Sequence, residues 1–215
     1  MLTYINMVSI IVCLKGCIMT NTEKIMKIVK ENNGTITSAE VTKAGLSRWS
    51  LKILVDSGKL EKSARGVYIL PEIWDDEMYN LQVQFKRGIF SVETALFLNG
   101  LTDRTPNRYQ MTFPIGYNVT SLKDENVKAI RTKEEFYELG VITVLTPAGN
   151  PVRTYGREKT LCDILRGINN TDIQIVSEAF KQYAKDKDKN IPLLSEYAKI
   201  LRVEKRLRSY LEVLI

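Results

Sequence analysis

Polar and cationic side chains gather in one short segment, Ser47 to Ser57, which has the apolar spacing of an α-helix. Its first two turns carry Arg48, Ser50 and Lys52. Arginine offers two parallel donors that match guanine, serine a short donor or acceptor, and lysine a cation for phosphate. Because a helix fits the major groove and reads bases near its N-terminus, this segment predicts contact with duplex DNA.

A second basic group follows within a predicted β-hairpin. Leu60–Lys62 and Val67–Ile69 are expected strands, joined across Ser63–Gly66. Arg65 at the tip, with Lys59 and Lys62 nearby, is placed to follow phosphates or enter a minor groove. The alternative is a solvated hairpin that only covers the edge of a small domain.

The same helix predicts one core face and one exposed face. Helical periodicity places Ser47 with the core residues Leu51, Leu54 and Val55, and leaves Arg48, Trp49, Lys52 and Ile53 outward. Trp49 is expected either to contact the sugar-phosphate backbone or a thymine methyl group, or to pack with Ile53 against a second domain.

The sequence also predicts the helices and the strand that must position these side chains. Thr20 and Glu23 have the spacing of a capping box, which starts a first helix that Asn32-Asn33-Gly34 ends. Thr35–Thr37 reads as a strand, and Ser38 is the expected cap of a second helix through Ala44. Gly45 and Leu46 make the turn into the third helix. This order predicts a winged helix-turn-helix over residues 19–71.

The chain has 215 residues and a net charge of +6, distributed unevenly. The segment from Thr20 to Pro71 contains nine basic and five acidic residues, and the segment from Lys181 to Ile215 contains the same numbers. The region between them is acidic overall. Clustered positive charge strengthens binding to DNA by counterion release. The second basic block is expected to extend the DNA footprint or to meet another acidic partner; its candidate residues are Lys181, Lys185, Lys205, Arg206 and Arg208.

Residues 72–215 predict a larger α+β domain with a helical C-terminus. The strands expected there are Arg108–Phe113, Val127–Arg131, Val141–Leu145 and Pro151–Tyr155. The expected helices are Asp75–Lys86, Val92–Asn99 after a Ser91 cap, Arg157–Arg166, Asp172–Lys185 and Leu193–Leu214, the last broken near Arg202.

The first eighteen residues are interpreted as a non-functional extension ahead of a start at Met19. They lack the basic start and cleavage site of a signal peptide, and Lys15 interrupts the apolar run before it reaches membrane-spanning length. Cys13, Cys17 and Cys162 do not make a disulfide framework, so a reducing cytoplasm is expected.

Arg157, Glu158, Lys159 and Asp163 resemble the ingredients of a nuclease site. Adjacent Glu158 and Lys159 point apart on a helix, however, and the chain has no histidine, phosphate-binding glycine loop or nucleophile elbow. We therefore expect no catalytic, metal or cofactor site. Helix capping by Glu158 and a surface pair of Asp163 with Arg166 or Lys159 are the structural alternatives.

Three segments resemble the AbiEi-type antitoxins of abortive-infection systems. They are Ala64–Tyr68, then Phe90–Leu96 with Gly100-Leu101, then Tyr155–Leu165, and the resemblance spans nearly all of Met19 to Ile215. The N-terminal extension departs from this pattern.

The resemblance implies a bacterial type IV antitoxin that counters a nucleotidyltransferase-like toxin without a stable complex and represses its own operon at promoter inverted repeats. It implies that the protomers can associate on DNA alone, with no membrane partner. Two rivals stay open: a winged-helix regulator whose second domain binds a ligand or partner, and a nuclease delivered to DNA by the wing.

Overall fold

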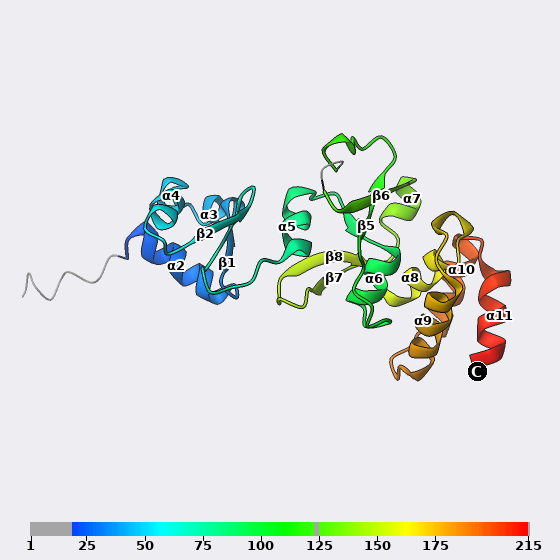
Figure 1. Ribbon diagram of the computed structural model, residues 1–215. Helices are drawn as coiled ribbons and strands as arrows, with labels where there is room; N and C mark the ends of the chain where they lie inside the picture. The colour runs from blue at the N-terminus through cyan, green and yellow to red at the C-terminus, as the bar shows by residue number, and fades with distance from the viewer. Residues whose placement is uncertain (1–18, 123–124, 215) are drawn as a thin grey trace, which may run out of the picture. The chain divides into compact units, whose positions relative to one another are not determined.

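The computed structural model describes residues 19–122 and 125–214, which form helices and two sheets in a mixed α+β arrangement (Figure 1). The chain divides between Asp75 and Asp76 into an N-terminal unit and a C-terminal unit. The interpretation of residues 1–18, with Cys13 and Cys17, lies outside the described residues.

The N-terminal unit places three helices beside a small antiparallel sheet of order β1-β3-β2. Its elements are α2 (Asn21–Glu31), β1 (Thr35–Thr37), α3 (Ser38–Lys43), α4 (Trp49–Asp56), β2 (Glu61–Ala64) and β3 (Val67–Ile69). Its core is the buried set Ile25, Val29, Ile36, Val41, Leu51, Leu54 and Leu60. The predicted capping box of Thr20 and Glu23 is confirmed.

The cap of α3 lies one residue earlier than predicted. Thr37, not Ser38, accepts from the Glu40 amide at 3.2 Å, and the Glu40 carboxylate accepts from the Thr37 amide at 2.7 Å. The glutamate decides this position, because a capping box requires it three residues after the cap. Ser38 is therefore the first residue of the helix.

The start of α4 also differs from the prediction. Arg48 occupies the cap position, so Ser47 lies outside the helix and is exposed rather than directed to the core. Ser50 is only 6% exposed, because its position four residues before Leu54 places it on the buried face. The expected helix begins two residues before α4, which explains why Ser47 is wrongly placed on the core face.

The C-terminal unit is built on a five-stranded sheet of order β6-β5-β4-β8-β7. β5 and β6 are parallel, as are β4 and β8, whereas β4/β5 and β7/β8 are antiparallel. The strands are β4 (Ile89–Phe90), β5 (Tyr109–Pro114), β6 (Val127–Thr132), β7 (Val141–Leu145) and β8 (Pro151–Tyr155). The four predicted strands are confirmed to within one residue, and β4 is an additional central strand.

The helices of this unit contribute to its apolar clusters. α5 packs with strand residues in one cluster, α6 and α8–α11 form most of another, and Tyr137 packs with Ile89 and Tyr155 in a third (Figure 1). The helices are α5 (Glu77–Gln84), α6 (Val92–Leu98), α7 (Glu134–Tyr137), α8 (Arg157–Ile164), α9 (Ile173–Lys185), α10 (Ile191–Ile200) and α11 (Glu204–Leu214), with 3-10 turns η1 (Thr120–Leu122) and η2 (Gly167–Asn169). The predicted break is confirmed at Arg202, whose φ of 58° ends α10.

Ser91 precedes α6 as predicted, but its hydroxyl makes no capping bond. The Gln110 side chain on β5 instead accepts from the Glu93 amide at 3.2 Å. Val92 has a φ of 51°, a strained conformation for a β-branched residue. A tertiary contact therefore replaces the local cap at this helix start.

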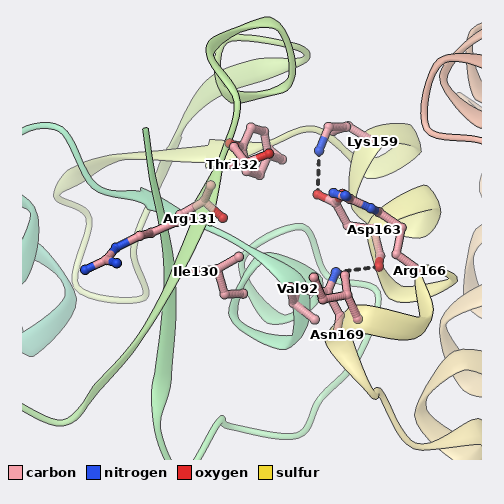
Figure 2. A pocket seen from close by; sticks show the side chains of 11 residues that line it. Val92, Ile130, Arg131, Thr132, Lys159, Asp163, Arg166 and Asn169 are labelled. Atoms are coloured by element: carbon pink, nitrogen blue, oxygen red, sulfur yellow. Dashed lines mark hydrogen bonds and ion pairs between the residues drawn. The ribbon is translucent and has the colours of Figure 1, made fainter. Parts of the chain in front are cut away.

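A buried ion pair joins successive turns of α8. Lys159 Nζ lies 2.6 Å from Asp163 Oδ2, with side-chain exposures of 3% and 6% (Figure 2). The ammonium also lies 4.2 Å from the centre of the Tyr155 ring, and Arg166 Nη1 lies 3.7 Å from Asp163 Oδ1. The predicted pair is thus present but buried rather than on the surface, because α8 packs against α6, α9 and α10.

Changing Asp163 to alanine should lower the free energy of unfolding by about 3–5 kcal/mol, because it leaves the Lys159 charge buried without its carboxylate. Lys159→Met should cost less, because Asp163 keeps the nearby Arg166. Urea denaturation of both variants measures the difference. A small and equal loss would contradict a buried pair.

Thr37→Ala should destabilise the N-terminal unit by about 1 kcal/mol, because it removes one half of the α3 capping box. Ser38→Ala is the matched control, since its hydroxyl only makes a long 3.4 Å bond to the Gly66 carbonyl. Thermal unfolding of the two variants compares them. A larger loss for Ser38→Ala would return the cap to Ser38.

Candidate nucleic-acid interface

The α3 helix connects the two basic segments of the N-terminal unit. Arg48 Nε donates to Thr42 Oγ1 at 2.8 Å, and Thr42 Oγ1 donates to the Ser38 carbonyl at 2.9 Å. The Ser38 amide in turn donates to the Gly66 carbonyl, next to the hairpin tip, at 2.9 Å. One hydrogen-bonded path therefore runs from the start of α4 through α3 to the hairpin.

Arg48 is held without being neutralised. Its Nε is occupied by Thr42, while its side chain is exposed and forms no ion pair with the described residues. The two terminal nitrogens are the ones that form the parallel fork recognised by guanine or phosphate. A hydroxyl that orients the guanidinium in advance reduces the entropy lost on binding.

The exposed face of α4 combines charge with an aromatic surface. Trp49 is 63% exposed, and Lys52 Nζ lies 5.0 Å from the centre of its ring. Ile53 is also exposed. The predicted outward direction of these residues is confirmed. Ser50 is the exception among the predicted base-reading residues, because its buried side chain faces the core of the unit.

The hairpin presents a second set of cations. Arg65 is exposed between β2 and β3, and Gly66 after it has a φ of 81°, a conformation that glycine adopts without a Cβ clash. A bulge between Lys62 and Ala64 accompanies the shift in register. Lys62 is exposed and pairs in register with Tyr68.

Lys59 lies elsewhere on the unit. It lines a pocket with Glu23 and Lys27 of α2, and its charge contributes to the lowered pKa of Glu23. Hydrogen bonds from the Thr20 backbone and hydroxyl to that carboxylate are the larger causes of the lowered pKa. Lys59 therefore lies beside α2, just before β2 begins.

The second basic block divides between two surfaces of the C-terminal unit. Lys181 and Lys185 are exposed on α9 and line a pocket with Arg104 and Glu178. Lys205 and Arg206 line another pocket with Arg166 and Arg202. Arg206 Nη1 also donates to the Leu165 carbonyl at 2.6 Å, so part of its guanidinium caps α8. Arg208 is exposed on α11.

The residues that resembled a nuclease site are engaged in packing. Glu158 is not the helix cap, a position held by Gly156; it accepts from the Tyr183 hydroxyl at 2.9 Å. Asp163 is paired with Lys159, as described above. Burial raises the pKa of the Cys162 thiol to about 12, which keeps that thiol protonated. Within residues 19–122 and 125–214, no group of three or more His, Cys, Asp or Glu is placed to hold a metal ion.

Sequence reasoning missed the positioning role of Thr42. Its exposed hydroxyl lies six residues before Arg48, a spacing that no regular element predicts.

The described helices include none with the length and apolar character that a membrane span requires.

The N-terminal unit has a match among protein families. Residues 23–71 match the family model described as "Transcriptional regulator, AbiEi antitoxin". No curated protein matches the chain. Among solved structures, the RV2827C protein from Mycobacterium tuberculosis is similar over 91% of this chain and 82% of its own, with 14% sequence identity and a TM-score of 0.45. The segment that contains the path from Arg48 to Gly66 thus matches AbiEi antitoxin transcriptional regulators.

Proposed function

We propose that residues 19–71 form a winged helix-turn-helix that binds duplex promoter DNA. In this proposal α4 is the recognition helix and the β2–β3 hairpin is the wing. The observation that carries it is the hydrogen-bonded path from Arg48 through Thr42 and Ser38 to Gly66, because it holds two unpaired cationic elements in one geometry. The family match over the same segment supports a regulator role.

The groups proposed to bind DNA have distinct tasks. Arg48 reads a base edge, Lys52 and Lys62 bind phosphate, and Arg65 enters a minor groove or follows the backbone. Trp49 supplies apolar contact beside Lys52. Ser50 is buried and therefore does not contact DNA in this proposal, whereas Lys59 is a peripheral phosphate contact.

We further propose that the chain is the antitoxin of a type IV system, with residues 72–215 countering a nucleotidyltransferase-like toxin in the cytoplasm. The match to AbiEi antitoxins supports this role. Repression of its own operon then follows from binding to promoter inverted repeats. A toxin-rescue assay in cells separates this role from that of a plain regulator, because only an antitoxin restores growth.

A salt-resolved binding titration of the Met19–Ile215 protein tests the DNA-binding proposal. It compares the promoter fragment of the protein's own operon with a scrambled fragment of equal length. Preferential binding that weakens steeply with salt is the expected result. Equal binding to both fragments, or no binding, would reject the repressor role and would favour a function in which the second domain binds a partner.

Arg48→Ala should weaken operator binding by about 1–3 kcal/mol while changing binding to random DNA little, because it removes a base contact. Thr42→Val should cost about 0.5–1.5 kcal/mol at the operator, since it frees the Arg48 guanidinium. In an Arg48→Ala background the Thr42 change should have no further effect. Titrations of the single and double variants measure this coupling, and additive losses would exclude a positioning role for Thr42.

Arg65→Ala should weaken binding to operator and random DNA alike and lower the salt slope by about one unit, as expected for one lost phosphate contact. The same titrations at several salt concentrations give the slope. Lys128→Ala on β6 is the control, because it removes an exposed cation outside the proposed winged helix-turn-helix. A loss confined to the operator would assign Arg65 to base reading instead.

A further inference from the structure

The two edges of the C-terminal sheet differ in their chemistry. At one edge, β6 carries the exposed cations Lys128 and Arg131, which oppose pairing with another strand. At the other edge, β7 has the sequence Val-Ile-Thr-Val-Leu, and no charged residue occurs from Leu139 to Val152. Ile142 and Leu145 are exposed, Leu145 by 64%. The β7 edge therefore lacks the usual protection against strand addition.

The hydrogen-bonding phase of β7 defines which main-chain groups are free. The Gly156 amide donates to the Gly140 carbonyl at 2.8 Å, and the Thr146 amide to the Asn150 carbonyl at 2.9 Å. Hydrogen-bonded pairs alternate along an antiparallel ladder, so the amides and carbonyls of Ile142 and Val144 point toward β8. The amides and carbonyls of Val141, Thr143 and Leu145 therefore point away from the sheet.

These free groups are self-complementary. If a second β7 pairs antiparallel with Thr143 opposite Thr143, Val141 falls opposite Leu145 and Ile142 opposite Val144. All three outward-pointing residues then form hydrogen-bonded pairs, each of which exchanges two main-chain bonds. The facing side chains are Thr–Thr and apolar–apolar, combinations that stabilise cross-strand pairs. A two-fold axis through Thr143 therefore allows both the main-chain hydrogen bonds and the favourable side-chain pairs to form.

We propose that β7 is a self-association edge, at which two copies of this chain join their C-terminal sheets antiparallel about Thr143. A second copy is favoured over an unrelated strand because the main-chain phase and the side-chain sequence are both symmetric about the same residue. One short strand pair buries less than the roughly 1,200 Å² of a standard interface, so the dimer is weak and concentration-dependent in solution.

Sedimentation velocity of the full chain without DNA tests this proposal over a wide range of concentrations. We expect a reversible monomer–dimer equilibrium. Thr143→Lys should weaken it about tenfold or more, because it places two ammonium groups opposite each other. Ile115→Lys is the control, because it adds the same charge at an exposed position that lies beyond the end of β5.

A charge-swap experiment tests the register. Thr143→Glu should also be monomeric, whereas an equimolar mixture with Thr143→Lys should associate, because opposite charges then face each other across the axis. Circular dichroism and thermal melting establish that each variant is folded. A wild-type chain that stays monomeric at every concentration would overturn the proposal, as would a dimer that neither variant weakens. DNA is absent from the measurement, so its outcome is independent of operator binding.

Discussion

The bond from the Ser38 amide to the Gly66 carbonyl is the constraint on which the N-terminal unit depends. It fixes the hairpin to the first residue of α3, and Thr42 one turn later holds Arg48 at the start of α4. These bonds link three short elements that have little intrinsic stability of their own. The net value of each bond is about 1 kcal/mol, so their contribution is mainly geometric.

The C-terminal unit is organised around buried polar contacts of a different kind. Lys159 and Asp163 neutralise each other within α8, below the aromatic ring of Tyr155. Glu158 is bound by Tyr183 of α9, and Arg206 of α11 caps α8. Glu158, which looks like a catalytic candidate in the sequence, therefore joins α8 to α9, whereas Lys159 and Asp163 pair within α8. Lys181 and Lys185 on α9, Arg208 on α11 and Leu145 on β7 are exposed.

The two units divide the proposed tasks by their chemistry. The exposed cations of the N-terminal unit suit a polyanion, and binding of a polyanion weakens as the salt concentration rises. The uncharged β7 edge suits a strand, whose affinity is set by main-chain bonds and is insensitive to salt. On DNA with adjacent half-sites, even a weak contact of this kind would gain from the high effective concentration of two bound protomers.

Elements whose signals are local can be predicted from the amino-acid sequence. The Thr20 capping box, the strand of Thr35–Thr37 and the break at Arg202 each depend on a few neighbouring residues, and each was predicted correctly. Only the folded structure reveals the cap that Gln110 provides for α6, the central strand β4 and the Thr42 contact of Arg48. These depend on residues brought together from different elements, and local periodicity contains no information about such partners.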